Sequence, residues 1–149
     1  VRFGMVHRNT FINGPTVLRD TWQTKRRDDL FFAGQVSGVE GYVESAASGL
    51  MAGRHAAALA LGRPIRVPPR TTAMGAMAFY VAHANPEHYQ PANVTFGIIP
   101  ALVPDGGRRV PRKKAERNAA LSARALEDLA RWLAEAPAVP AGAAAPGRA

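Results

Sequence analysis

The residues best placed to hold a ligand stand where a short apolar run gives way to a glycine-rich turn. Gly34, Gly38 and Gly41 follow the apolar run 30–33 and precede a long stretch of Ala, Ser, Gly and Leu. Glycine lets a ligand approach the backbone, and a helix that starts beside such a turn offers free amides and a positive dipole end to an anion. Close packing of that helix on a strand explains the same pattern. The spacing alone supports both interpretations, because isolated glycine patterns often bind nothing.

A second group of polar side chains lies near the start of the chain. It consists of His7, Arg8, Asn9 and Thr10. These residues offer several hydrogen-bond donors in a small space, which recognition of a carboxylate or a ring carbonyl needs. A solvated loop with self-satisfied side chains is the alternative.

The strongest basic cluster spans residues 108–117 and includes Arg112, Lys113, Lys114 and Arg117. Basic side chains at the start of a helix oppose its dipole, a cost that a bound polyanion offsets, so we favour RNA phosphate binding over a merely solvated face. The formal net charge of +8, from 19 Lys and Arg against 11 Asp and Glu, suits such a partner. The charged turn 25–29 is expected to be solvated surface, with a phosphate contact as the alternative.

Metal and thiol chemistry have little support in the sequence. His83 and His88 stand near Glu87, but their spacing matches no dependable metal pattern. The chain has no Cys, which excludes disulfides, thiolate metal sites and a cysteine nucleophile within it. No apolar run approaches the roughly 20 residues that cross a bilayer, so we expect no membrane span and a cytoplasmic protein.

The glycine-rich turn is predicted to join a buried strand to a long helix. Residues 30–33 have the length and aromatic content of a strand. The sequence Ser37-Gly38-Val39-Glu40 fits a capping box, which predicts a helix from near Gly38 to Leu61, ended by Gly62. Small residues recur on one face of this helix, which we expect to lie close to a sheet. They are Ser45, Ala46, Gly49 and Gly53.

Further elements follow in order. Thr71 or Thr72 can cap a short helix through about His83, with Met74, Met77 and Val81 in its core-facing stripe. Residues 93–102 read as an extended apolar segment. The basic cluster leads into a helix to about Ala134, whose predicted apolar stripe comprises Leu121, Ala125, Leu126, Leu129, Trp132 and Leu133. Residues 136–149, mostly Ala, Pro and Gly, are expected to be disordered.

Several of these motifs together resemble one enzyme family. FFAGQVSGVEGYVESAASGLMAG, preceded by GMVHRNTFING and followed by TTAMGAM and ANVTFGIIPAL, resembles the C-terminal third of the folate- and FAD-dependent tRNA (uracil-5-)-methyltransferases. The similarity runs from about Val1 to Leu102 and continues more weakly through the basic helix. A sister family, which installs carboxymethylaminomethyl groups on wobble uridines, shares the AGQ-x-x-G pattern but not VEGYVESAA or HRNTFIN.

The resemblance implies an α/β fold: the C-terminal part of a glutathione-reductase-like FAD-binding domain, incomplete, with helix outweighing strand. It divides the chain into a segment of the FAD-binding domain (1–62), a helical extension carrying the basic helix (63–135) and a tail (136–149). The chain begins without Met, in an alternating run (1–5) that reads as a strand already under way, so we expect an N-terminal part of the same protein upstream. The catalytic cysteines that the family uses are then expected upstream too.

The resemblance also implies roles for particular residues. The FAD-binding set is Gly34, Gln35, Gly38, Val39, Glu40, Gly41 and Tyr42. The folate and substrate pocket is lined by His7, Arg8, Asn9, Thr10 and Tyr42. The tRNA-binding set is Arg112, Lys113, Lys114 and Arg117.

The implied activity belongs to the longer protein. Members of the family take a methylene group from methylenetetrahydrofolate through FAD to C5 of a T-loop uridine in tRNA, with NAD(P)H as reductant, and so make 5-methyluridine. The alternatives are a fragment of the wobble-uridine-modifying flavoprotein and a non-catalytic basic RNA-binding module. The chain by itself is expected to be inactive, because it has neither a G-x-G-x-x-G phosphate-binding fingerprint nor a cysteine.

Overall fold

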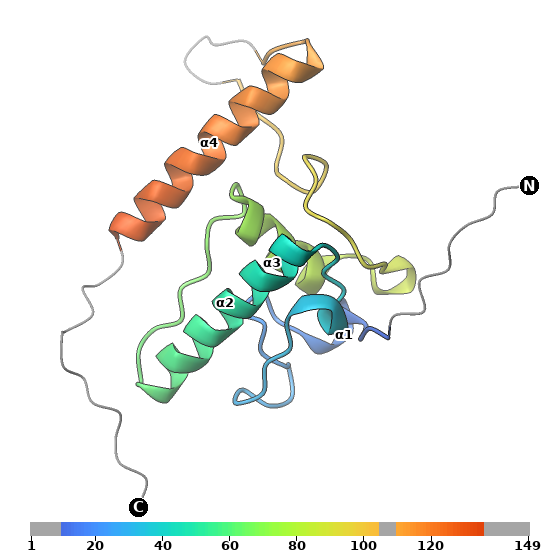
Figure 1. Ribbon diagram of the computed structural model, residues 1–149, viewed down its shortest axis with the longest axis vertical. Helices are drawn as coiled ribbons and strands as arrows, with labels where there is room; N and C mark the ends of the chain where they lie inside the picture. The colour runs from blue at the N-terminus through green and yellow to red at the C-terminus, as the bar shows by residue number, and fades with distance from the viewer. Residues whose placement is uncertain (1–9, 105–109, 136–149) are drawn as a thin grey trace, which may run out of the picture.

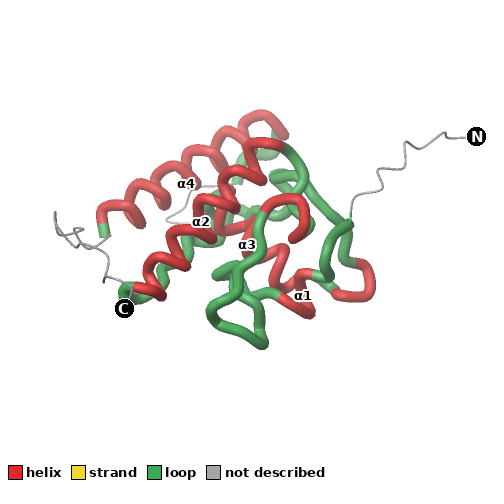
Figure 2. The backbone as a smooth tube through the Cα atoms, turned by 60° about the horizontal axis from the view of Figure 1, so that its bottom comes forward, coloured by secondary structure: helices red, strands yellow, loops and turns green. Residues whose placement is uncertain are grey.

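Helices and loops make up the part of the chain that the computed structural model describes, residues 10–104 and 110–135. The elements are α1 (Gly14–Val17), the 3-10 helix η1 (Gly34–Ser37), α2 (Tyr42–Ala60), α3 (Ala73–His83), the 3-10 helix η2 (Pro86–His88) and α4 (Lys114–Ala134). Figure 2 draws no strand among these residues, which contain isolated β-bridges instead. Helix therefore outweighs strand, as predicted. The predicted opening strand and the predicted disordered tail lie outside the described residues.

The long helix α2 begins later than predicted. Its N-cap is Gly41, with φ 88°, and the Ser37 hydroxyl donates to the Gly34 carbonyl within η1 instead of capping. The predicted capping box is therefore wrong, because Gly38 (φ 87°) and Gly41 (φ 88°) have positive φ angles, which lie outside the right-handed helical region. The C-terminal end follows the prediction: Leu61 is the C-cap and Gly62, with φ 62°, follows it.

The apolar run 30–33 is extended but is not a buried strand. Phe31 forms a single antiparallel bridge with Gln23, and the Phe32 amide donates to the Trp22 carbonyl. Phe31, Phe32 and Ala33 are only half-buried, and Leu30 is 36% exposed. The prediction of a buried strand thus fails within the described residues, where no second strand covers this run.

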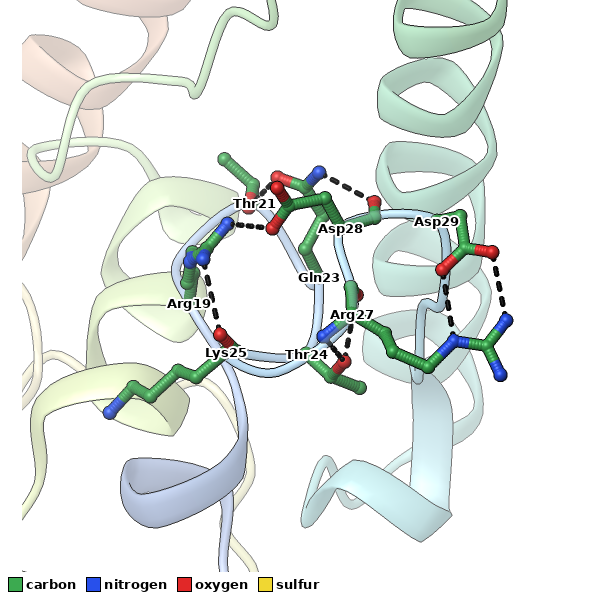
Figure 3. Close-up of polar contacts among 8 residues, drawn as sticks. All are labelled: Arg19, Thr21, Gln23, Thr24, Lys25, Arg27, Asp28 and Asp29. Carbon is green, nitrogen blue, oxygen red and sulfur yellow. Dashed lines mark hydrogen bonds and ion pairs between the residues drawn. The ribbon is translucent and has the colours of Figure 1, made fainter.

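The charged residues 25–29 close a hairpin-like loop that starts at the bridge between Leu18 and Thr24. Figure 3 shows two ion pairs at this loop, Arg19 with Asp28 at 2.6 Å and Arg27 with Asp29 at 2.8 Å, and a Lys25 side chain that points away from both. The Lys25 ammonium donates to the Pro15 carbonyl. All of these charged residues are exposed, so the loop lies at the surface, as predicted, and the phosphate contact stays an alternative.

The largest core cluster draws on residues far apart in the sequence. Its buried members are Leu18, Trp22, Val39, Met51, Ala52, Met77, Ala78, Val81 and Trp132. The helix α3 contacts both α1 and α2, and Thr72 caps it by accepting a hydrogen bond from the Gly75 amide at 3.1 Å. Met77 and Val81 are 3% and 1% exposed, so the predicted cap and the predicted apolar stripe of α3 are confirmed. This cluster contains residues from both sides of residue 62, and the division of the chain into domains stays a prediction.

His55 is a buried polar member of the α2 face that packs inward. Its side chain is 2% exposed, with Nδ1 2.9 Å from the Thr21 carbonyl oxygen and Nε2 3.0 Å from the Arg66 carbonyl oxygen. The imidazole thereby links α2 to the loop before it and to the connector after it.

The helix α4 lies along the outside of the molecule in Figures 1 and 2. Leu121 and Trp132 are buried, whereas Leu126 and Leu133 are 68% and 50% exposed, so only part of the predicted stripe packs inward. The Arg66 guanidinium lies over the Trp132 ring, 5.2 Å from its centroid, and donates to the Trp132 carbonyl. These contacts fasten the C-terminal half of α4 to the connector before α3.

Two further predictions differ from the structure. A turn at residues 96–99, in which the Ile98 amide donates to the Thr95 carbonyl, interrupts the extended segment predicted for residues 93–102. The small-residue face of α2 is open: Gly49 and Gly53 are exposed, and a Cβ added at either would meet nothing within 4 Å. No described segment covers this face, although the spacing predicted close packing there. Among the described residues, no helix is long and apolar enough to cross a membrane.

Candidate functional site

The glycine-rich corner between residues 33 and 45 is held in place by its own hydrogen bonds. The Gly34 amide donates to the Ser48 hydroxyl at 2.8 Å, and the Ser48 hydroxyl donates to the Ser45 carbonyl. The Ser45 hydroxyl donates to the Val39 carbonyl at 3.2 Å. Serines of α2 therefore pin η1 and the segment that follows it to the side of the helix.

A parallel bridge fixes the middle of the corner. The Glu40 amide donates to the Ala92 carbonyl at 2.9 Å, and the Ala92 amide donates to the Gly38 carbonyl at 3.0 Å. A Cβ at Gly38 would lie 2.2 Å from the Tyr89 hydroxyl oxygen, closer than any real contact. Gly38 is therefore required both by its backbone angle and by the tyrosine against it.

The first turn of α2 is the open part of the corner. The amides of Tyr42, Val43 and Glu44 have no hydrogen-bond acceptor among the described residues. Tyr42 is 98% exposed and Val43 is 79% exposed. Free amides at the start of a 19-residue helix favour an anionic group.

One carboxylate already stands near that opening. Glu44 lies in the first turn of α2, and a Cβ at Gly41 would fall 2.2 Å from its Oε2 atom. A carboxylate in a first turn interacts favourably with the helix dipole. An incoming anion therefore competes with Glu44 for the dipole.

A cavity of about 460 Å³ opens beside this turn. Its lining is Trp22, Val43, Glu44, Ala47, Ser48, Met51, Ala73, Met74, Met77 and Val94. Glu44 is the one ionisable residue in that lining, and apolar side chains of α2 and α3 supply most of the wall. An apolar cavity of this size, with a few polar groups at one edge, is typical of a small-molecule site.

The predicted polar cluster can be placed only in part. His7, Arg8 and Asn9 lie outside the described residues, and Thr10 is exposed. Two residues further on, the Ile12 amide donates to the Val36 carbonyl at 2.8 Å. The structure therefore brings the chain two residues after this cluster to η1.

The residues predicted to bind FAD occupy different environments in the corner. Gln35, Gly41 and Tyr42 are exposed, and Gly34 and Glu40 are half-buried. Gly38 and Val39 are buried, and the Val39 side chain belongs to the core cluster. The set is thus brought together along one turn, and its binding role stays a prediction.

The four residues predicted to bind tRNA lie at and just before the start of α4, and their binding role stays a prediction. Arg112, Lys113, Lys114 and Arg117 are all exposed. Lys113 pairs with Glu116 at 3.4 Å, and Glu116 places one acidic group in the first turn of α4. No group of three His, Cys, Asp or Glu residues that could hold a metal ion occurs among residues 10–104 and 110–135.

Comparison with known proteins shows what this part of the chain is similar to. Residues 1–64 match the family model described as glucose inhibited division protein A. The match covers the glycine-rich corner and the whole of α2.

Individual relatives are more specific. A protein of Lacticaseibacillus paracasei is 55% identical over 134 residues, which are 90% of this chain, and is named methylenetetrahydrofolate–tRNA-(uracil-5-)-methyltransferase TrmFO. Relatives with the same name are 55% identical over 129 residues in Bacillus cereus and 48% identical over 134 residues in Koribacter versatilis. The resemblance predicted from the motifs is therefore confirmed. The chain spans only 29% of the length of the first two relatives and 30% of the third.

Proposed function

We propose that this chain is the C-terminal part of a folate- and FAD-dependent tRNA (uracil-5-)-methyltransferase. The longer enzyme would replace the C5 hydrogen of a T-loop uridine by a methyl group, whose carbon comes from the methylene of methylenetetrahydrofolate and whose extra electrons come from NAD(P)H. The observation that carries the proposal is the 55% identity over 90% of the chain to a protein of that name. A tRNA substrate would place the enzyme in the cytoplasm.

The glycine-rich corner fits a bound flavin in several respects. The three free amides of the first turn of α2 and the helix dipole suit the pyrimidine edge of the ring, where negative charge collects on reduction. Tyr42, 98% exposed at the first position of α2, offers a flat ring for stacking on the flavin or on the folate. FAD would supply the one-carbon and electron transfer, while these residues hold and orient it.

The other predicted site residues would surround the bound flavin. His7, Arg8, Asn9 and Thr10 would line the folate side, supported by the contact of the Ile12 amide with Val36 in η1. Gly34, Gln35, Gly38, Val39, Glu40 and Gly41 would shape the turn beneath the ring, with Val39 acting through the core. The fold around them would be the end of a glutathione-reductase-like α/β domain (1–62), whose remaining strands belong to the N-terminal part. Residues 63–135 would form the helical extension and 136–149 a tail.

The exposed small-residue face of α2 supports the proposal that this chain is part of a longer protein. Gly49 and Gly53 leave a shallow, small-residue surface that no described segment covers. Such a surface lets another element approach the helix backbone closely. In the longer protein, the N-terminal part would cover it.

The basic start of α4 would serve tRNA binding through Arg112, Lys113, Lys114 and Arg117, all of them exposed. Neutralising phosphates releases counterions, so binding through these residues depends steeply on salt. Charge reversal at Lys113, Lys114 and Arg117 should weaken tRNA binding and flatten its salt dependence.

Two experiments test this proposal. The codons upstream of Val1 should continue the reading frame and encode a strand-linked G-x-G-x-x-G; a start codon directly before Val1 would contradict the proposal. The protein purified from its complete gene should be yellow and should form 5-methyluridine in an unmodified tRNA transcript when given methylenetetrahydrofolate and NAD(P)H. A wobble-uridine product would favour the sister family, and RNA binding without flavin would favour the non-catalytic module.

A pair of variants then tests the flavin seat. Tyr42→Ala should change the visible flavin spectrum and lower the folate affinity. Leu126→Ala removes an exposed apolar side chain from α4, where Leu126 is 68% exposed. This control should change neither the flavin spectrum nor the folate affinity. Equal behaviour of the two variants would remove Tyr42 from the site.

A further inference from the structure

A second hollow, of about 400 Å³, lies between the turns 96–102 and the N-terminal half of α4. Its apolar floor includes Ile99 and Leu121, which are 9% and 5% exposed and form a small core cluster with Ala76. In Figure 1 the chain at residues 96–102 runs up toward the start of α4. The hollow is therefore closed below by packed side chains and lies beside the basic residues of α4.

The rim of this hollow combines an aromatic ring with two guanidinium groups. Phe96 lines it and is 43% exposed, although a phenylalanine gains by burial. Arg70 and Arg117 line it as well, and both are exposed. Among the described residues, none of those that line the hollow is acidic.

The guanidinium groups of Arg70 and Arg117 form no hydrogen bond and no ion pair with the described residues. Arg70 lies over the Phe79 ring, with its guanidinium carbon 3.6 Å from the ring centroid. A cation–π contact uses the charge of the guanidinium and none of its N–H groups as hydrogen-bond donors, so these groups can donate to phosphate oxygens.

Arg124 lies on α4, like Arg117, but its guanidinium is already hydrogen-bonded. Its guanidinium donates to the Ala101 carbonyl at 3.0 Å and to the Pro100 carbonyl. It therefore holds the turns 96–102 against α4, while Arg117, about two helical turns earlier, stays available to a ligand.

We propose that this hollow binds an unpaired RNA nucleotide, with the base stacked on Phe96 and the flanking phosphates held by Arg70 and Arg117. The inference rests on the proposed tRNA-modifying function and adds to it a site that reads an unstacked base. Recognition of RNA commonly targets unpaired nucleotides, whose bases stack on aromatic side chains and on arginine. The neighbouring exposed cations Arg112, Lys113 and Lys114 extend the positive surface beyond one nucleotide, which favours a polymer over a free nucleotide.

The test uses a short RNA hairpin with 2-aminopurine in its unpaired loop, together with a fully paired RNA duplex of the same length. The base should lose fluorescence when it stacks on the ring, and the full chain should bind the hairpin more tightly than the duplex. Phe96→Leu keeps an apolar side chain but removes the ring, and should abolish the quench and weaken hairpin binding about tenfold. Phe96→Tyr keeps the ring and should retain both.

Matched charge variants separate the arginine contact from net charge. Arg117→Gln should reduce the slope of log affinity against log salt by about one. Arg26→Gln removes the same charge from the loop 25–29, which lies at the opposite end of the molecule from the start of α4 in Figure 1, and should leave the slope nearly unchanged. Circular dichroism confirms that each variant is folded.

Several results would overturn the proposal. Among them are a quench that persists in Phe96→Leu, a duplex bound as tightly as the hairpin, and equal effects of Arg117→Gln and Arg26→Gln. Displacement of the hairpin by polyglutamate at equal charge concentration would also overturn it, because the surface would then accept any polyanion.

The same variants distinguish this proposal from the proposed function. If the complete protein methylates tRNA and Phe96→Leu leaves its KM for tRNA unchanged, the nucleotide site is wrong and the methyltransferase function stands. If the complete protein forms no 5-methyluridine while the hairpin quench depends on the Phe96 ring, the methyltransferase function is wrong and the RNA site stands.

Discussion

The Tyr89 hydroxyl donates a 2.6 Å hydrogen bond to the backbone carbonyl of Ser37, across 52 residues of sequence. Both residues are buried, Tyr89 at 5% exposed and Ser37 at 0%. The ring fills the space beside Gly38 and packs on Tyr80 with centroids 5.7 Å apart. The segment after η2 thus determines the shape of the glycine-rich corner.

This relationship predicts a loss of stability in Tyr89→Phe. The variant keeps the ring but leaves the Ser37 carbonyl buried without its donor, which costs about 1–3 kcal/mol in the free energy of unfolding. Urea denaturation followed by circular dichroism measures the loss. Tyr42→Phe removes a hydroxyl from a 98% exposed ring and should change the stability by less than about 0.5 kcal/mol.

The same hydroxyl predicts a weakening of the fold at alkaline pH. Burial, and to a lesser extent the nearby Tyr80, raises the pKa of Tyr89 above its ordinary value of 10.0. On raising the pH, the Tyr89 hydroxyl loses its proton in the unfolded chain before it does so in the folded protein. Its contribution to the free energy of unfolding is therefore complete below pH 10 and falls above pH 10 by about 1.4 kcal/mol per pH unit. The difference in stability between the wild type and Tyr89→Phe should therefore shrink above pH 10. A constant difference up to the alkaline limit of folding would contradict this assignment.

Two glycines predict opposite responses to alanine. Gly38→Ala would force a Cβ against the Tyr89 hydroxyl at φ 87°, so we expect a loss of more than about 2 kcal/mol, from steric overlap and backbone strain together. Gly49→Ala lies within α2, where a Cβ meets nothing within 4 Å, and should stabilise this chain by up to about 1 kcal/mol. Thermal denaturation of both variants measures the two signs.

Gly49→Ala also tests whether another element covers the small-residue face of α2. In the protein made from its complete gene, the added methyl group would meet the covering element and the stabilisation should disappear. If the substitution stabilises both forms equally, this face is solvent-exposed in the longer protein too.

Local patterns in the sequence predicted the helices better than the glycine-rich corner. Thr72, Gly62 and the stripe of Met77 and Val81 act through neighbours one or two turns away, so their roles could be inferred from spacing alone. The start of α2 was wrong because a capping-box pattern does not reveal that Gly38 and Gly41 have positive φ. That conformation follows from the bridge to Ala92 and from the Tyr89 ring, both more than 45 residues away.

The missing strands have a similar cause. The run at Phe31 and Phe32 has strand composition, but a strand needs a neighbour, and the described residues supply only the bridge to Gln23. The hollow lined by Phe96 and Arg70 was not predicted either. Phe96 and Arg70 are 26 positions apart in the sequence. The one local signal was a phenylalanine in a loop rich in glycine and proline.

His55 predicts that a polar side chain is essential at a buried position of α2. Both ring nitrogens lie within hydrogen-bond distance of carbonyl oxygens, those of Thr21 and Arg66. His55→Leu removes the donor and leaves a carbonyl buried, so we expect a loss of about 1–3 kcal/mol. His88→Leu, at an exposed position of η2, is the control and should lie within about 0.5 kcal/mol of the wild type. Equal urea midpoints for the two variants would show that His55 acts as apolar filler.

Arg124 and Arg117 are expected to have different roles at the hollow. Arg124 should hold the turns 96–102 against α4, and Arg117 should bind a ligand. Arg124→Met retains most of the apolar stem but removes the donors to the Pro100 and Ala101 carbonyls, so the turns 96–102 should detach from α4. We expect a loss of stability of about 1–2 kcal/mol, together with faster hydrogen exchange of the Leu121 amide and of the turn amides. Arg117→Met, at an exposed position without a hydrogen-bond partner among the described residues, should change neither quantity. If Arg124→Met leaves hydrogen exchange at the wild-type rate, the packing of Ile99 against Leu121 is sufficient to hold these turns, and the two guanidinium bonds are dispensable.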